Sequence, residues 1–492
     1  MLANIYKKAY DPDATAIKFK GNSISYGELD DAVNHYATFF YQLGVKDGKR
    51  VILSCPNSPE FIYSYFGVVK TGAIIVPINV QLTIEEINYF INDSEAEYMI
   101  IHPKIIENLN QSQESLQRLL GIKLIVLDQV FQRAIAEISP IKLDQIADEK
   151  AISTFLYTSG TTVQQKAAML THKNLLVNAE QCRIAFDALP SDNYLCVLPM
   201  FHVFGFTVCV LNPLLSGASI TILEGFHPNA VVESLLNDDI TVFIGVPTMY
   251  VLLLAACKND YTFPNLRWAG SGGASLPVEI LRQARNVLKL PVVEGYGLTE
   301  ASPSVCFNPL HGIQKEGSIG LPLPYVKCKV VDENDMEVPV GEVGELLVQG
   351  ENVMLGYYKQ EKETKETLRN GWLHTGDLAR QDEDGYYYIV ERKKDLVIVG
   401  GLNVYPSEIE EVIYKYPKVK ETAVVGIQDK LRGEYVKAFI VLKEGEECTA
   451  KEISKFLRER IASYKMPRVI EFISELPKNA SGKILKRILK TM

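Results

Sequence analysis

Short apolar runs alternate with longer amphipathic stretches over roughly the first 300 residues of the chain. Each run is rich in β-branched or other apolar residues and is too short for a helix, which is typical of a buried strand. The runs that predict strands lie at 51–53, 74–76, 98–101, 124–127, 195–198, 220–223 and 242–246. Because strands that alternate with helices form parallel sheets covered by those helices, the pattern predicts an α/β fold.

The stretch 29–43 shows the helical half of this alternation. Its apolar residues recur at helical spacing and share one face: Leu29, Val33, Tyr36, Phe40 and Leu43. Ser25 and Glu28 have the spacing of a capping box, in which each side chain bonds the backbone N–H of the other residue. Gly44 is suited to end the helix. The sequence therefore predicts an amphipathic helix packed on a sheet.

The pattern changes in the last third of the chain. Glycines, turns and short strands dominate 327–390, which predicts a smaller β-rich subdomain. A charged stretch follows at 391–395, and strand-like and helix-like segments then recur in a compact block. Within this block Thr449 and Glu452 form a second capping-box pattern.

We therefore expect two domains, with the boundary near Lys394. The N-terminal domain spans 1–393 and includes the β-rich subdomain, and a small α+β domain spans 394–492. Its expected elements are strands at 396–399, 422–425 and 438–442 and helices at 406–414 and 449–461.

Composition and charge narrow the class of protein. Of its residues, 47% are hydrophobic and 23% are charged, which is an ordinary composition for a globular protein. A chain of 492 residues is too long for one hydrophobic core. A net charge of −9 argues against a general nucleic-acid binder, so we expect no nucleic acid partner. The eight cysteines are scattered without a Cys-x-x-Cys pair, which favours a reducing cytoplasm and no structural zinc.

The chain also lacks the sequence features of a membrane protein. Its first residues contain no apolar core of a signal peptide. The longest apolar region, 201–215, is interrupted by His202, Asn212 and Pro213 and is shorter than the roughly 20 residues that a membrane span needs. We therefore expect a cytoplasmic protein with no membrane span, and a buried core segment at 201–215.

Candidate chemistry is densest at 157–172, YTSGTTVQQKAAMLTH. A predicted strand at 153–157 runs into hydroxyls around a glycine, and a lysine follows. In such a loop, backbone N–H groups and hydroxyls donate to phosphate oxygens, and the lysine adds a positive charge. The alternative is a Ser/Thr-rich surface turn. The candidate phosphate ligands are Thr158, Ser159, Gly160, Thr161, Thr162 and Lys166.

A second candidate segment is 294–300, EGYGLTE, which follows a predicted strand end at 292–293 and is therefore expected on a loop. The carboxyl edge of an α/β sheet is where such folds bind ligands. Tyr296 offers a flat face for a base, Gly297 lets the backbone approach a ligand, and Glu300 offers a hard oxygen for Mg²⁺. Taken singly, Gly-Tyr-Gly is a common turn and a lone glutamate is usually solvated.

Three further residues carry weaker signals. Asp377, in WLHTGDL, has two oxygens that can accept both hydroxyls of a ribose, although an aspartate beside a glycine is usually a turn. Lys483 stands between Gly482 and an apolar pair, which favours a fixed backbone, although lysines near a terminus are usually exposed. His202 lies on the apolar run PMFHVFG, where a histidine is more often a core residue.

Taken in chain order, these segments resemble the signature motifs of adenylate-forming enzymes, and of their acid–CoA ligase branch in particular. The superfamily includes acyl-CoA synthetases, non-ribosomal adenylation domains and luciferases. The similar segments span 157 to 483, most of the chain. In the family, the segment similar to GSGGA at 270–274 flanks the adenine and acid pocket, which implicates Gly273 and Ala274. The segment similar to GGLNVYP faces the pantetheine tunnel of acid–CoA ligases, which implicates Gly401 and Asn403.

The resemblance also implies roles at the nucleotide. Tyr296 would stack on adenine, Thr299 would contact the α-phosphate and Glu300 would ligate Mg²⁺. Asp377 and Arg392, the latter from the segment ERKKD, would bind the ribose.

At the acid, the resemblance implicates Lys483 and His202. Lys483 would enter the active site and bind both the carboxylate and the phosphate as the adenylate forms. The segment around His202 lines the acyl pocket of the family. Relatives that activate amino acids carry an aspartate there, whereas His202 and Val203 provide no carboxylate. An α-amino acid substrate is therefore disfavoured.

By this resemblance the protein is a ligase that uses ATP, Mg²⁺ and CoA. A fatty or aryl acid would attack the α-phosphorus of ATP, giving acyl-AMP and pyrophosphate, and the thiol of CoA would then displace AMP. The family moves its C-terminal domain between these steps, and the corresponding hinge is Lys394. One alternative is a stand-alone adenylating enzyme that loads an acyl or peptidyl carrier protein. Another is a ligand binder without turnover.

The loop departs from the family pattern at three positions, and these departures predict weaker ATP use. Val163 and Ala167 stand where relatives have glycine, and Gln165 stands where they have proline. A valine in a backbone that glycine adopts with positive φ costs about 1–2 kcal/mol. We expect the double change Val163→Gly with Gln165→Pro to lower the apparent KM for ATP in steady-state assays. An unchanged or raised KM would contradict this interpretation.

Overall fold

The structure is a computed structural model that describes residues 2–8, 11–143, 148–158, 165–257, 261–289, 291–429, 433–480 and 482–492. The described residues form four sheets with helices packed on them. The predicted α/β class is therefore confirmed.

The largest sheet runs through the middle of the chain. Its strands are β1 (Thr15–Phe19), β2 (Asn22–Ser25), β9 (Asn193–Cys196), β10 (Ser219–Ile222), β11 (Val242–Gly245), β12 (Trp268–Ser271), β13 (Val292–Gly297), β14 (Ser304–Phe307) and β15 (Leu321–Pro322). They lie in the order β15-β14-β13-β12-β11-β9-β10-β1-β2. The strands from β13 to β1 pair in parallel, and both edges are antiparallel.

A six-stranded sheet packs the N-terminal third. Its strands are β3 (Arg50–Ser54), β4 (Ile74–Pro77), β5 (Tyr98–Ile101), β6 (Lys123–Val126), β7 (Ile152–Thr158) and β8 (Lys166–Thr171). Their order is β6-β5-β3-β4-β7-β8, and the pairs are parallel except for β7 with β8. The predicted strands of both sheets are confirmed, with ends displaced by at most two residues.

Two five-stranded sheets follow in the last third. One contains β16 (Lys327–Val331), β17 (Gly344–Gln349), β18 (Leu368–Arg369), β19 (Trp372–Gln381) and β20 (Tyr387–Arg392). The other contains β21 (Val397–Val399), β22 (Leu402–Val404), β23 (Val419–Asp429), β24 (Gly433–Leu442) and β25 (Val469–Phe472). The last sheet has a buried apolar cluster of its own, which includes Val424, Ile440 and Ile453.

The helices and short helical turns connect these strands. They are η1 (Leu2–Lys7), α1 (Tyr26–Gln42), α2 (Pro59–Lys70), α3 (Ile84–Ser94), α4 (Pro103–Asn108), α5 (Gln113–Leu120), α6 (Gln129–Glu137), α7 (His172–Ala185), α8 (Val203–Phe206), η2 (Thr207–Leu211), α9 (Asn212–Ser216), α10 (Pro228–Asn237), α11 (Pro247–Ala256), α12 (Val278–Leu288), η3 (Thr299–Ala301), α13 (Glu361–Thr367), η4 (Lys393–Asp395), α14 (Pro406–Tyr414), α15 (Ala450–Arg458), η5 (Ser463–Lys465) and α16 (Lys486–Leu489).

The local signals in the sequence account for several of these boundaries. Both predicted capping boxes are present, at Ser25 with Glu28 and at Thr449 with Glu452. The apolar region 201–215 forms α8, η2 and most of α9, and nearly all of it is buried, as predicted. Among the described residues, no helix combines the length and the apolar character that crossing a bilayer requires.

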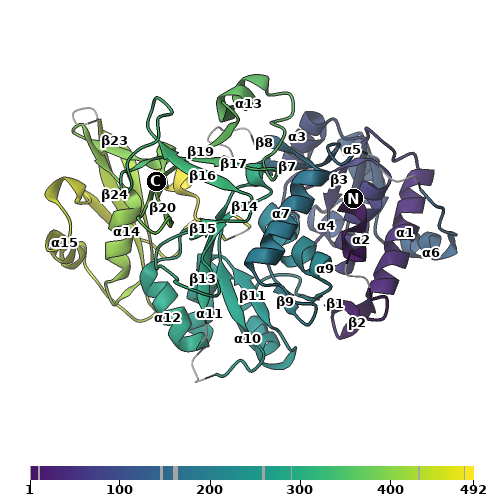
Figure 1. Cartoon of the computed structure of the whole chain (residues 1–492), viewed down its shortest axis with the longest axis horizontal. Coiled ribbons are helices and arrows are strands. Elements are labelled where there is room, and N and C mark those ends of the chain that lie inside the picture. Colours follow the sequence, from purple (N-terminus) through teal and green to yellow (C-terminus); the bar gives the residue numbers. More distant parts are fainter. Residues whose placement is uncertain are drawn as a thin grey trace.

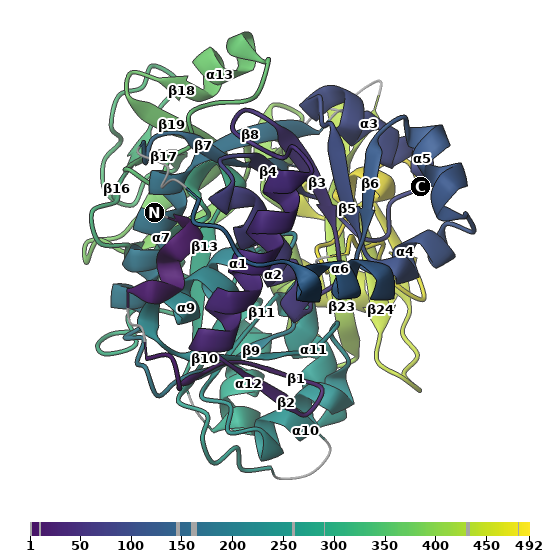
Figure 2. The same cartoon turned by 90° about the vertical axis from the view of Figure 1, so that its right-hand side faces the viewer.

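The elements follow the chain along the long axis of the molecule. Figure 1 shows the C-terminal elements β23, β24, α14 and α15 at one end, α1 and α2 at the other, and β13, β16 and β19 between them. In Figure 2 the strands β3, β5 and β6 run side by side, with α3, α4 and α5 around them. The candidate site residues come from the middle of this arrangement and from the C-terminal end.

Candidate active site

Tyr296 lies on a strand, and not on a loop as its glycine neighbours suggested. Strand β13 continues through Gly297, and Tyr296 pairs with Cys306 of the antiparallel strand β14. A Cβ on Gly297 would lie 2.3 Å from the carbonyl oxygen of Pro303, so glycine is required for this close pairing. The short turn η3 begins immediately afterwards and carries Thr299 and Glu300.

Tyr296 is joined to the two predicted ribose ligands. Its hydroxyl donates to Asp377 Oδ2 at 2.5 Å, and Arg392 Nε lies 3.2 Å from Asp377 Oδ1. Asp377 and Arg392 face each other across the β19–β20 ladder. Burial, together with the neighbouring carboxylate, raises the pKa of Tyr296 well above its ordinary value, so its hydroxyl stays protonated as a donor.

The backbone of β19 just before Asp377, where its pairing with β17 shifts register, is held by a glutamate that the sequence interpretation missed. The N–H of Gly376, whose φ is +71°, donates to Glu345 Oε1 at 3.1 Å. Lys393 Nζ lies 3.4 Å from Glu345 Oε2. Glu345 is buried on the apolar strand β17. An acidic residue within the apolar run GELLV was the available signal, because buried carboxylates need polar partners.

Glu300 and Lys166 lie on either side of one tyrosine. Tyr357 donates its hydroxyl to Glu300 Oε1 at 2.7 Å, and Lys166 Nζ lies 5.1 Å from the centroid of the Tyr357 ring. Thr158 pairs with Lys166 across β7 and β8. Tyr357 was not predicted, since nothing near it in the sequence marks it.

The middle of the predicted phosphate loop falls outside the part of the chain that the structure describes. Ser159, Gly160, Thr161 and Thr162 lie outside the described residues. So does Val163, one of the three departures from the family pattern.

Lys483, in the C-terminal segment, lies near the group formed by Tyr296, Asp377 and Arg392. Its pKa is lowered to about 8, mainly by burial; the charge of Arg392 acts in the same direction and that of Asp377 in the opposite one. The backbone N–H of Lys483 donates to Asn479 Oδ1 at 2.9 Å, and the preceding carbonyl, of Gly482, accepts from Thr248 Oγ1 at 3.1 Å. The chain thus places a half-buried lysine near the Tyr296–Asp377–Arg392 contact.

His202 also faces Lys483. Burial and the charge of Lys483 lower the pKa of His202 to about 4, so its imidazole is neutral near pH 7. His202 Nδ1 lies 3.2 Å from the N–H of Phe204 and accepts from it, which assigns the ring proton to Nε2. That N–H can donate to a carboxylate oxygen. Phe204 packs against Gly272, where a Cβ would lie 2.9 Å from its ring.

The remaining predicted residues lie in two places, one near Phe204 and the other on a hairpin of the C-terminal segment. Gly273 and Ala274 are exposed just beyond the end of β12, near Phe204. Gly401 and Asn403 lie on the exposed β21–β22 hairpin, which packs on η5. None of the contacts recorded among the described residues joins this hairpin to Lys483 or Asp377. Gly401 and Asn403 therefore lie outside the group of site residues around Asp377 and Lys483.

The donor set fits a magnesium ion carried by a nucleotide. Within the described part of the chain, no three His, Cys, Asp or Glu side chains form a metal cluster. Mg²⁺ binds through one or two carboxylates plus substrate phosphates and water, and so does not need such a cluster. Glu300 provides one carboxylate near Lys166.

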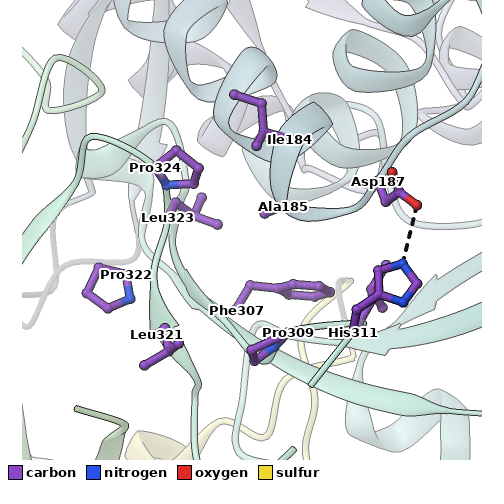
Figure 3. Close-up of a pocket in the computed structure, with 11 residues that line it drawn as sticks. Ile184, Ala185, Asp187, Phe307, Pro309, His311, Leu321, Pro322, Leu323 and Pro324 are labelled. Carbon is purple, nitrogen blue, oxygen red and sulfur yellow. Dashed lines mark hydrogen bonds and ion pairs between the residues drawn. The ribbon is translucent and has the colours of Figure 1, made fainter. Parts of the chain in front are cut away.

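A separate cavity of about 320 Å³ lies between the end of α7 and the strands β14 and β15 (Figure 3). Phe307 and the prolines 309, 322 and 324 line it, and His311 Nε2 lies 3.3 Å from Asp187 Oδ2 at its edge. None of the predicted site residues lines this cavity.

This chain is similar to known proteins over most of its length. It matches the family model described as AMP-binding enzyme over residues 6–358, and the model described as AMP-binding enzyme C-terminal domain over 408–483. It is 35% identical to a long-chain-fatty-acid–CoA ligase of Bacillus subtilis, with 97% of this chain and 91% of that protein aligned. It is also 35% identical to a feruloyl-CoA synthase of Amycolatopsis sp, with 96% and 95% aligned.

Solved structures agree over the full length. The ATP-bound crystal structure of MatB from Rhodopseudomonas palustris superposes with a TM-score of 0.93 at 32% identity, covering 100% of this chain and 99% of that one. The apo crystal structure of the same protein gives a TM-score of 0.81 over the same coverage. The arrangement of this chain is therefore more similar to the ATP-bound form.

Proposed function

Because this chain belongs to the AMP-binding enzyme family and its relatives are CoA ligases, we propose that it joins a carboxylic acid to CoA at the group of residues around Lys483. In the first step a carboxylate oxygen attacks the α-phosphorus of ATP, and the bond to the β-phosphate breaks to release pyrophosphate. In the second step the sulfur of CoA attacks the acyl carbon, and AMP leaves. The observation that carries the proposal is the half-buried Lys483 near the contact of Tyr296, Asp377 and Arg392.

The nucleotide side of the site follows from these contacts. Asp377 keeps free lone pairs on both oxygens, because each carboxylate oxygen can accept more than one hydrogen bond, so it can accept from the ribose hydroxyls. Tyr296 presents its ring to the base, and Glu300 would hold Mg²⁺, which supplies charge neutralisation at the phosphates. Lys166 lies against the ring of Tyr357, whose hydroxyl bonds Glu300, and suits the outer phosphates.

The acid side of the site rests on Lys483 and His202. The Lys483 ammonium can donate to both a carboxylate and an α-phosphate oxygen, and so hold the two reacting groups together. His202, neutral with its proton on Nε2, donates to the second carboxylate oxygen. Phe204 presents an apolar ring beside the Gly272 backbone, which suits a fatty or aryl acid.

A screen of pyrophosphate release tests this function. The purified chain is assayed with ATP, Mg²⁺ and a panel of fatty, aryl and dicarboxylic acids, with and without CoA. We expect release with at least one fatty or aryl acid, and thioester only when CoA is present. Thioester on an acyl carrier protein but not on CoA would favour the carrier-loading enzyme. Binding of nucleotide without any release would contradict the ligase and favour a ligand binder.

We also propose that the chain divides into domains at 1–393 and 394–492, with Lys394 as the hinge. Lys394 lies in the turn η4, between the last strand of one small sheet and the first strand of the next. The exposed hairpin with Gly401 and Asn403 would reach the site only after a rotation about this turn. Such a rotation would exchange Lys483 for the hairpin at the site between the two steps.

Lys394→Pro tests the hinge. Proline fixes φ and restricts the residue before it, so the turn loses the freedom that a rotation needs. We expect pyrophosphate exchange to be retained and thioester formation to be lost. Lys394→Ala, which removes the side chain but leaves the backbone free, should retain both activities. An equal fall of both half-reactions in the proline variant would show that the hinge lies elsewhere.

A further inference from the structure

The helices α11 and α12 begin without caps of their own. Their N-cap residues, Val246 and Pro277, make no side-chain bond to the first turn. The first backbone N–H groups of a helix have no partner inside it, and its N-terminus carries a partial positive charge. In each case a residue of the C-terminal segment, beyond Asp395, contacts this end of the helix.

The contact at α11 is made through Thr248. Its hydroxyl donates to the carbonyl oxygen of Gly482 at 3.1 Å, across 234 residues of chain. The approach is close, because a Cβ on Gly482 would lie 2.7 Å from Thr248 Oγ1, and Gly482 has a φ of +81°. That carbonyl belongs to the peptide bond that leads into Lys483. A hydrogen bond here therefore restrains the backbone from which the Lys483 side chain departs.

The contact at α12 is made through Glu411 of α14. Its Oε1 accepts from the N–H of Val278, the first residue of α12, at 3.3 Å. A carboxylate at this position interacts favourably with the helix dipole. Tyr414, one turn further along α14, packs against the large apolar core of the N-terminal part. Glu411, in the C-terminal segment, thus caps the start of α12 in the N-terminal part of the chain.

We propose that Thr248 and Glu411 are positioning residues that hold the C-terminal segment in the arrangement that forms the adenylate. The inference rests on the proposed function of Lys483. Both contacts join residues before Arg392 to residues after Asp395, so any rotation about η4 breaks both. They stabilise the arrangement in which Lys483 is half-buried near Asp377, and they do not contribute to one in which Lys483 has left.

The experiment separates the two half-reactions in Thr248→Val and Glu411→Gln. Adenylate formation is followed as ATP–pyrophosphate exchange with dodecanoate or ferulate, whichever acid the wild type activates. The second half-reaction is followed as thioester formation from synthetic acyl-AMP and CoA. We expect each variant to lose about three- to tenfold in exchange, the equivalent of one hydrogen bond, with thioester formation unchanged or faster. An unchanged exchange rate, or an equal loss in both half-reactions, would overturn the proposal.

Matched variants keep the test specific. Thr248→Ser retains the hydroxyl and should restore most of the exchange rate. Glu279→Gln removes a carboxylate from the first turn of α12 that bonds only within its own helix, to Gln283, and should leave both rates unchanged. Failure of serine to rescue the exchange rate, or a comparable loss in Glu279→Gln, would count against the proposal.

A second readout does not depend on turnover. The purified protein is treated with an amine-reactive acetylating reagent, and the labelling of Lys483 is followed by mass spectrometry against the exposed Lys443 as an internal reference. Loss of either contact should accelerate labelling of Lys483 relative to Lys443 by several-fold. Equal labelling in wild type and Thr248→Val would overturn the proposal, whereas an inactive wild type with accelerated labelling in the variant would overturn only the proposed function.

Discussion

Replacing Lys483 with methionine is expected to lower the rate of acyl-AMP formation by about 10²–10³-fold, since a preorganised cation at developing charge is worth that much. The wild-type amine is half-buried and close enough to Asp377 and Arg392 for their charges to act on its pKa. The measurement is single-turnover formation of acyl-AMP from ATP and acid. Thioester formation from synthetic acyl-AMP and CoA should change far less, because that step does not use this amine in the proposed mechanism.

The pH dependence identifies the same group. Because the pKa of Lys483 is about 8, the ammonium is present below that pH and is lost above it. The kcat/KM for ATP, which reports the free enzyme, should therefore fall as the pH rises through about 8. This basic limb should be absent in Lys483→Met. Lys443→Met, at an exposed lysine of the same segment, should retain both the rate and the limb; loss of either would contradict the assignment.

The change Asp377→Asn is expected to lower kcat/KM for ATP by about 100-fold and to leave the KM for the acid nearly unchanged. Hydrogen bonds to a charged group contribute about 1.5–3 kcal/mol, and 100-fold corresponds to about 2.7 kcal/mol. The amide also leaves Arg392 without its carboxylate partner and presents an N–H₂ group where a ribose hydroxyl needs an acceptor.

Initial rates at varied ATP and varied acid measure this effect. Asp384→Asn is the matched control, because Asp384 is an exposed acid of the β19–β20 connection that pairs with Lys315. It should behave as wild type. If Asp377→Asn raised the KM for the acid as much as that for ATP, the carboxylate would belong to the acid side of the site and the ribose assignment would be wrong.

Features that depend on neighbouring residues were predictable from the sequence. The capping boxes of α1 and α15 and most strand positions follow from side-chain spacing within a single element. Tyr296, Asp377 and Lys483 were also predicted, since each stands in a short segment that resembles a motif of the family. The structure then brings all three together.

Features that depend on distant segments were not predictable in this way. Tyr296 was expected on a loop, yet it pairs in a strand, because β14 approaches so closely that only glycine fits at position 297. Tyr357 and Glu345 carry no motif, and they matter because the fold places them against Glu300 and Gly376.

By itself the sequence predicted the candidate residues and their order, because each motif that resembles the family lies within one short segment. Only the tertiary structure decided which of them meet in one arrangement. Thr248 and Gly482 are 234 residues apart, and Lys483 becomes half-buried when the last segment packs against α11. Burial and contact across segments are properties of the packed chain, so they set the pKa of Lys483 and leave the Gly401–Asn403 hairpin outside.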